Sequence, residues 1–121
     1  MMDKLIEEVQ ECVEREYGRA GAKFGLTNHS DHESYAIMLE EFEEAMEDVA
    51  DVNRQMSVFW GDTKCNAFND KKLDICRKIE SSALLAACEF IQVAAMAKKA
   101  AITLCNRAAA KEFKGEDGNT A

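Results

Sequence analysis

The sequence predicts an all-α fold, a bundle of about four helices that is completed by oligomerisation. The 121 residues include no proline and only six glycines, so long stretches of the chain meet no helix-breaking residue. In several of these stretches apolar residues recur at steps of three and four, the spacing of one helix face. A chain of this length forms one domain with a sizeable core. We therefore expect a single helical domain over residues 1–113 and a flexible tail over residues 114–121.

The N-terminal part predicts one short helix followed by a loop. Leu5, Val9 and Val13 fall on one face, with glutamates on the other, as an amphipathic helix requires. This helix is expected to end near Gly18. The stretch 18–30 contains three glycines and little periodicity, which predicts a loop long enough to favour a functional role.

A capping-box sequence predicts the start of a second helix. Ser30 followed by Glu33 has the spacing in which each side chain accepts a hydrogen bond from the other residue's backbone N–H. Helical spacing then continues to Trp60, and Gly61 is expected to end the helix. Its apolar positions alternate steps of four and three and form a seam of seven residues: Met38, Phe42, Ala45, Val49, Val52, Met56 and Phe59.

The remainder predicts a connection over residues 61–70 and helix over residues 73–113. We expect two helices there, because a single helix of that length would outrun a compact domain. The short first helix cannot cover the whole seam of the second. Apolar surface around Met56, Phe59 and Trp60 is therefore expected to bind another subunit, which predicts a homo-oligomer.

Charge and apolar content predict a soluble, cytoplasmic protein. The net charge of -8 and the pI of about 4.8 oppose binding to nucleic acids and to anionic membranes. No uninterrupted apolar run reaches about 18 residues, and residues 1–10 lack the pattern of a signal peptide. The five cysteines form no CxxC pair. We expect buried free thiols, with disulfides or a zinc site as the alternatives.

Acidic residues are densest in the second helix. Seven lie within about three turns: Glu40, Glu41, Glu43, Glu44, Glu47, Asp48 and Asp51. Such a run is commonly a solvated helix face. Glu40, Glu47 and Asp51 point away from Phe42 at 100° per residue, whereas Glu41 reaches the edge of the core. Glu41 and Glu44, three residues apart, can converge on one cation.

A second carboxylate stands out in the later helical region. From Ala83 to Ala97 every residue is apolar except Glu89 and Gln92, which predicts a buried helix. Because a buried carboxylate needs a partner, Glu89 is expected to contact either a Lys or Arg, or Gln92 or Tyr35, or a divalent ion shared with Glu41 and Glu44. Oxygen ligands suit Mg²⁺, with Mn²⁺ as a substitute.

A di-iron bundle site is not expected. Such sites use Glu-x-x-His motifs, and the only histidines, His29 and His32, lie at the start of the second helix outside that spacing. We interpret both as loop or cap residues.

The motif Glu41-x-x-Glu44, followed by a Glu-x-x-acid-like element at Glu89, resembles the MazG-like all-α nucleoside triphosphate pyrophosphohydrolases. The stretch from Phe24-Gly25 to Leu39-Glu40-Glu41, together with EFIQVAAMA at 89–97, is similar to small phage and prophage proteins grouped with that superfamily. The resemblance covers residues 24–52 and 85–100, a minority of the chain.

The resemblance implies hydrolysis of a (d)NTP to a monophosphate and pyrophosphate, with Mg²⁺ held by the acidic motif. Glu41, Glu44 and Glu89 match the catalytic, metal-binding carboxylates. Gln92 stands where the family generally has Asp, which implies that Gln92 is a further metal ligand through its neutral carbonyl oxygen and that the site carries one negative charge fewer. The interval from Glu44 to Glu89 is also longer than is usual in the family.

Three further residues are candidates for substrate binding. Lys99 lies about two turns beyond Gln92 on the same face, where its ammonium can meet a phosphate. Lys23 and Phe24, in the glycine-containing loop, are placed to stack on a base. The rival hypothesis is a non-catalytic helical oligomer with a structural or interaction role, in which Glu89 makes a structural polar contact.

Overall fold

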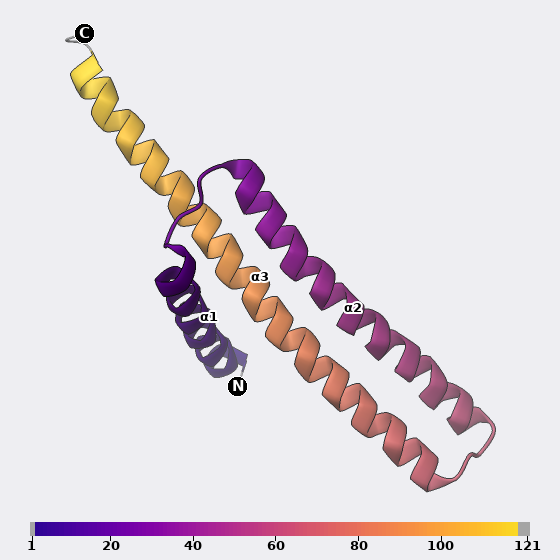
Figure 1. Ribbon diagram of the computed structural model, residues 1–121. Coiled ribbons are helices and arrows are strands. Elements are labelled where there is room, and N and C mark those ends of the chain that lie inside the picture. The colour runs from indigo at the N-terminus through magenta and orange to yellow at the C-terminus, as the bar shows by residue number, and fades with distance from the viewer. Residues whose placement is uncertain (1, 119–121) are drawn as a thin grey trace. The chain divides into compact units, whose positions relative to one another are not determined.

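The structure, a computed structural model, describes residues 2–118, with side chains described for residues 2–110. These residues form three helices and no strand (Figure 1): α1 (Met2–Phe24), α2 (Asp31–Lys64) and α3 (Asn69–Gly118). The all-α class predicted from the sequence is confirmed. The described part of the chain contains three helices, not the four that were expected.

The difference in helix number arises in α3. The prediction of a break within residues 73–113 is wrong, because α3 is continuous over 50 residues. No proline occurs in it, and no glycine precedes Gly115, so no residue interrupts the backbone hydrogen bonds. Residues 114–118 of the predicted tail belong to this helix. Residues 119–121 lie outside the described residues.

α1 continues past Gly18 and ends at Phe24, so the loop is shorter than predicted. Gly25 has a φ of 94°, a left-handed conformation that glycine adopts without the strain of a side chain. Its N–H donates to the carbonyl of Gly21 at 2.8 Å, the hydrogen bond of a left-handed C-cap. Leu26 packs directly over Gly21, where a Cβ would lie 2.2 Å from the Leu26 side chain.

α2 begins at the predicted cap. The Glu33 N–H donates to Ser30 Oγ at 3.1 Å, as a capping box requires. The Glu33 carboxylate, however, accepts from the His29 N–H at 3.3 Å, one residue before the expected Ser30. The start of α2 is therefore as predicted, with a modified cap.

α2 passes through Gly61 and ends three residues later, at Lys64. The next turn contains Asn66, with a φ of 53°. The Ala67 N–H donates to the Asp62 carbonyl at 2.9 Å, and the Asn66 N–H donates to the Thr63 carbonyl at 3.3 Å. This pair of bonds satisfies two of the carbonyls left free at the helix end.

The chain divides into two compact units. The first combines residues up to Met38 with residues from Ile91 onwards, and the second is Leu39–Phe90. In the first unit, Gln92 Nε2 donates to Glu16 Oε2 of α1 at 2.5 Å, and Lys98 pairs with Glu14. Alternating small and large residues of α3 are buried there: Ala95, Met96 and Ala100.

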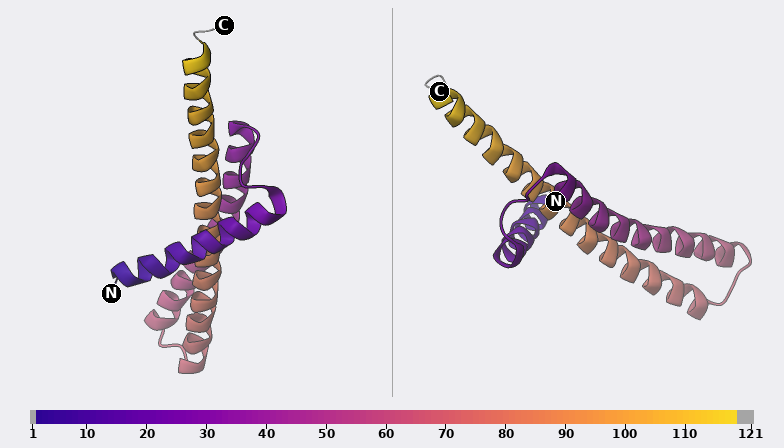
Figure 2. Two further views of the ribbon diagram at one scale, coloured as in Figure 1. Left: turned by 90° about the vertical axis from the view of Figure 1, so that its left-hand side faces the viewer. Right: turned by 45° about the horizontal axis from the view of Figure 1, so that its top comes forward.

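The second unit is an antiparallel hairpin of α2 and the first part of α3 (Figures 1 and 2). The Lys71 ammonium pairs with the Asp62 carboxylate at 3.1 Å near its turn. Buried and half-buried positions at steps of three and four form what we call the hairpin seam. On α2 these are Glu41, Ala45, Asp48, Val52, Gln55, Phe59 and Asp62, and on α3 they are Lys72, Ile75, Ile79, Ser82, Ala86 and Glu89.

The observed seam differs from the predicted one. Ala45, Val52 and Phe59 belong to both, and the predicted Val49 is half-buried, but Phe42 and Met56 are exposed. The apolar stripe of α2 is wider than one neighbouring helix covers, so the hairpin uses only one edge of it. Polar residues of α2 fill the other half of the seam.

Two predictions of burial are also wrong. In the apolar stretch Ala83–Ala97, Leu84, Leu85 and Phe90 are 61%, 56% and 41% exposed. The five cysteines are free, but four of them are exposed and Cys12 is half-buried. The reason is the same in both cases: within one chain each helix has a neighbour on only part of its circumference.

One described helical segment, Asn69–Ala110 of α3, is long and apolar enough by composition to cross a membrane. Its mean hydropathy over 18 residues reaches 1.4, and 17% of that window is buried. Core helices of soluble proteins can be equally long and apolar.

Candidate functional site

Three carboxylates meet across the hairpin of the second unit. Glu41 and Glu44 lie one turn apart on α2, and Glu89 lies on the antiparallel segment of α3. One oxygen atom from each lies within 4.8 Å of the others. The structure thus brings together the three acidic residues selected from the sequence. We call them the carboxylate cluster.

The surroundings of the cluster are partly dry. Glu41 and Glu89 are half-buried, and Glu44 is exposed. Among the side chains described for residues 2–110, no lysine or arginine forms an ion pair with any of the three. Of the partners considered for Glu89, Gln92 donates its amide to Glu16, and Tyr35 is exposed. The neighbours of Glu89 are therefore two other acids.

This crowding changes the acidity of two members. Burial raises the pKa of Glu41 above its ordinary value, and the charges of Glu44 and Glu40 add to the effect. A hydrogen bond with Glu89 raises the pKa of Glu44, followed by repulsion from the Glu89 charge. Carboxylates at this separation resist simultaneous ionisation unless a proton or a cation lies between them.

The donor set suits a hard divalent cation. Mg²⁺ prefers carboxylate oxygens and keeps several waters, so two helices that offer three carboxylates leave coordination positions for water and phosphate. A divalent cation would supply the positive charge that the cluster lacks. None of the lysines and arginines with described side chains supplies this charge.

Gln92, predicted as a further ligand, has a different contact. Its amide donates to Glu16 in the first unit, and this hydrogen bond, with a smaller effect of Arg19, lowers the pKa of Glu16. The contact links α1 to α3 within that unit. It was not predicted, because residues 76 positions apart leave no pattern in the sequence.

The predicted substrate-binding residues all belong to the first unit. Lys99 is buried, with 4% of its surface exposed. Lys23 and Phe24 lie at the end of α1, with the Lys23 ammonium 5.2 Å from the centre of the Phe24 ring. The Phe24 ring is 70% exposed.

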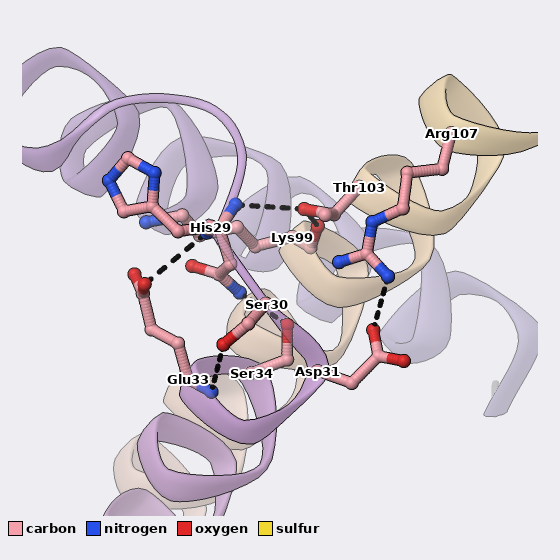
Figure 3. Close-up of polar contacts among 9 residues, drawn as sticks. His29, Ser30, Asp31, Glu33, Ser34, Lys99, Thr103 and Arg107 are labelled. Carbon is pink, nitrogen blue, oxygen red and sulfur yellow. Dashed lines mark hydrogen bonds and ion pairs between the residues drawn. The ribbon is translucent and has the colours of Figure 1, made fainter. Parts of the chain in front are cut away.

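A cluster of polar side chains at the start of α2 was not predicted from the sequence (Figure 3). The buried Asn28 N–H donates to Thr103 Oγ1 at 2.9 Å, and Asn28 Nδ2 donates to Ser34 Oγ at 2.8 Å. Thr103 in turn donates to the Lys99 carbonyl at 2.8 Å. Arg107 pairs with Asp31 at 2.8 Å. These contacts fasten the loop over residues 25–30 to α3.

Comparison with known proteins gives no match: no family model, no curated protein and no solved structure is similar to this chain. The fold and the site describe an all-α protein with a cluster of carboxylates between two antiparallel helices.

Proposed function

We propose that this protein hydrolyses a (d)NTP to a nucleoside monophosphate and pyrophosphate, with Mg²⁺ held by Glu41, Glu44 and Glu89. The observation that carries the proposal is the convergence of three carboxylates from two helices within 4.8 Å, without a basic partner among the described side chains. The resemblance of Glu41-x-x-Glu44 and Glu89 to the motifs of MazG-like phage-type pyrophosphohydrolases supports it.

The chemistry follows from the charges. A divalent cation held by Glu41, Glu44 and Glu89 would neutralise phosphate oxygens and make water a better nucleophile. Water attacks the α-phosphorus, and pyrophosphate leaves as the α–β phosphoanhydride bond breaks. Glu41 and Glu89 would hold the cation from half-buried positions, and Glu44 would hold it from an exposed one. With a net charge of -8, the protein needs such a cation to bind a polyanion.

The proposed setting is the cytoplasm, in a homo-oligomer that completes a helical bundle and binds neither nucleic acid nor membrane. The acidic surface supports this setting because it repels other polyanions.

Metal binding is the first test. Titration calorimetry with Mg²⁺ and Mn²⁺ should show binding at millimolar metal or below in wild type and not in Glu89→Gln. Glu47→Gln is the matched control, since it removes the same charge from the exposed outer face of α2. No heat of binding to wild type would remove the metal site and the proposed reaction with it.

Thermal melts give an independent readout. In EDTA, Glu89→Gln should be no less stable than wild type, because it removes repulsion within the cluster. Excess Mg²⁺ should raise the Tm of wild type alone. A large loss of stability in EDTA would instead reveal a structural partner for Glu89.

Release of pyrophosphate from the eight common NTPs and dNTPs is the test of activity. Wild type should release pyrophosphate from at least one, and Glu41→Gln should not.

The second candidate function is a non-catalytic helical oligomer. Gln92, in place of the family's Asp and bound to Glu16, favours it. Metal binding by wild type without pyrophosphate release from any nucleotide would select this alternative.

A further inference from the structure

We propose that Lys99 and Asn28 form a binding site for one hydrogen phosphate ion. Both residues belong to the first unit, whereas the carboxylate cluster belongs to the second, so the inference does not rest on the proposed hydrolysis. The sequence suggested only that the Lys99 ammonium can meet a phosphate. The structure adds the burial of Lys99, a second residue and a preference for an anion that still carries a proton.

Lys99 is a buried cation without a counter-ion among the described side chains. Only 4% of its surface is exposed, and no described carboxylate pairs with its ammonium. Its neighbour Lys98, by contrast, pairs with Glu14. A lysine is almost never buried this far without a charge partner, because an unpaired ammonium is costly to remove from water. An anion bound at Lys99 would remove that cost.

Asn28 supplies an acceptor without a donor. Its Nδ2 donates to Ser34 Oγ at 2.8 Å. Its Oδ1 is buried and has no hydrogen-bond partner among the described residues. Buried carbonyl oxygens are nearly always hydrogen-bonded, since an unpaired one lowers stability. A ligand that suits Oδ1 must therefore donate a hydrogen bond.

The two residues are connected through Thr103 (Figure 3). The Asn28 N–H donates to Thr103 Oγ1 at 2.9 Å, and the Thr103 hydroxyl donates to the Lys99 carbonyl at 2.8 Å. Lys99 and Thr103 are four residues apart and thus lie on one face of α3. The loop over residues 25–30 is therefore fastened to α3 next to Lys99, and it brings the unpaired acceptor to the same part of the helix as the unpaired ammonium.

This pair of groups distinguishes between small ligands. The ammonium of Lys99 only donates, and Asn28 Oδ1 only accepts. At pH 7 inorganic phosphate keeps at least one proton and sulfate keeps none, so phosphate can accept from Lys99 and also donate to Asn28. Water can make both hydrogen bonds, but it does not neutralise the buried charge. The site is thus expected to prefer hydrogen phosphate to sulfate.

An ion reaches Lys99 by local opening of the loop. Gly25 begins the loop with a φ of 94° and has nothing within 4 Å of a Cβ, so the backbone is free to turn there. The Tyr17 hydroxyl donates to the Leu26 carbonyl at 3.0 Å, and the Asn28 N–H donates to Thr103. Opening a short loop held by a few such contacts requires less free energy than unfolding the helices.

Titration calorimetry in EDTA with sodium phosphate and sodium sulfate tests the site. Without a metal ion the carboxylate cluster repels anions, so phosphate binding cannot come from that cluster. Wild type and Glu89→Gln should bind phosphate equally. Both should bind sulfate at least about 10-fold more weakly, because sulfate leaves Asn28 Oδ1 unpaired. Equal affinity for the two anions, or no binding of phosphate, would overturn the proposal.

The matched variants are Lys99→Met and Lys98→Met, which remove the same charge from neighbouring residues. Lys99→Met should weaken phosphate binding at least about 10-fold, and Lys98→Met should bind phosphate like wild type. Without phosphate, the Tm of Lys99→Met should be no lower than that of wild type, because the variant lacks a buried unpaired charge. A lower Tm or a failure to fold would reveal a structural partner of Lys99 and overturn the proposal, as would unchanged phosphate affinity in Lys99→Met.

Discussion

At the residue scale, the carboxylate cluster is a local excess of negative charge that the chain does not neutralise itself. Glu41 and Glu44 both have a raised pKa, which means that the folded protein holds their protons more tightly than the unfolded chain does. Burial of Glu41, and the hydrogen bond and repulsion between Glu44 and Glu89, thus lower stability at neutral pH. Proteins retain destabilising groups mainly where function requires them.

This repulsion predicts a pH-dependent effect of Glu44→Gln. Because the folded pKa exceeds the ordinary value of 4.5, the contribution of the Glu44 proton to stability is complete below pH 4.5 and is lost as the pH rises through the folded pKa. In EDTA, Glu44→Gln should therefore match wild type below pH 4.5 and be more stable than wild type at pH 7.

Denaturant unfolding at both pH values measures this difference. Glu47→Gln should show a smaller change between them. A variant that is less stable than wild type at pH 7 would contradict repulsion within the cluster.

A second residue-scale prediction concerns Thr103, which accepts the buried N–H of Asn28. Thr103→Val keeps the shape of the side chain and leaves that N–H without its partner. The free energy of unfolding should fall by about 1–3 kcal/mol.

Thr63→Val is the control for Thr103→Val. The Thr63 hydroxyl donates only to the Phe59 carbonyl of its own helix and is exposed, so its loss should change stability by less than about 0.5 kcal/mol. Equal effects of the two substitutions in urea unfolding would show that the Asn28 contact adds no stability.

At the element scale, the helix ends depend on backbone conformation more than on residue type. Gly18 lies in the interior of α1 with nothing within 4 Å of a Cβ at that position, whereas Gly25 ends the helix with a φ of 94°. The same residue type thus has two different roles seven residues apart.

Alanine at these two glycines should have opposite effects. Gly18→Ala should stabilise the protein by up to about 1 kcal/mol, because alanine favours helix. Gly25→Ala should destabilise it by about 1–2 kcal/mol, because a side chain is strained at that φ. Thermal melts of both variants decide it, and a shift of the same sign would show that the end of α1 is not set at Gly25.

The contrast explains which elements the sequence predicts well. The start of α2 is recognisable because Ser30 and Glu33 are a local signal, with the cap hydrogen bond in place. The end of α1 was misplaced because three glycines lie close together, and only Leu26 packing over Gly21 selects the last of them. The convergence of Glu41 and Glu44 follows from helical spacing alone. The contact of Gln92 with Glu16 depends on tertiary packing and has no local signal.

At the scale of the whole molecule, burial is unevenly distributed along α3. In the first unit, Ala95, Met96, Lys99, Ala100 and Thr103 are buried, whereas every residue of 104–110 is exposed. Local opening is easiest where a helix has few packed neighbours.

Hydrogen exchange should reveal this gradient. Backbone amides of residues 104–110 should exchange at least about 10-fold faster than those of residues 95–103, because only the latter must open packed contacts. Mass spectrometry of overlapping peptides measures both segments in one experiment. Uniform protection to residue 110 would mean that another surface covers residues 104–110.

The charged residues at the two ends of the hairpin depend on one alignment of its helices. Lys71 meets Asp62 near the turn, and Glu41 and Glu44 meet Glu89 at the far end. A slide of α3 along α2 would separate Lys71 from Asp62 and Glu89 from Glu41 and Glu44. The alignment that forms the ion pair at the turn is therefore the same alignment that assembles the carboxylate cluster.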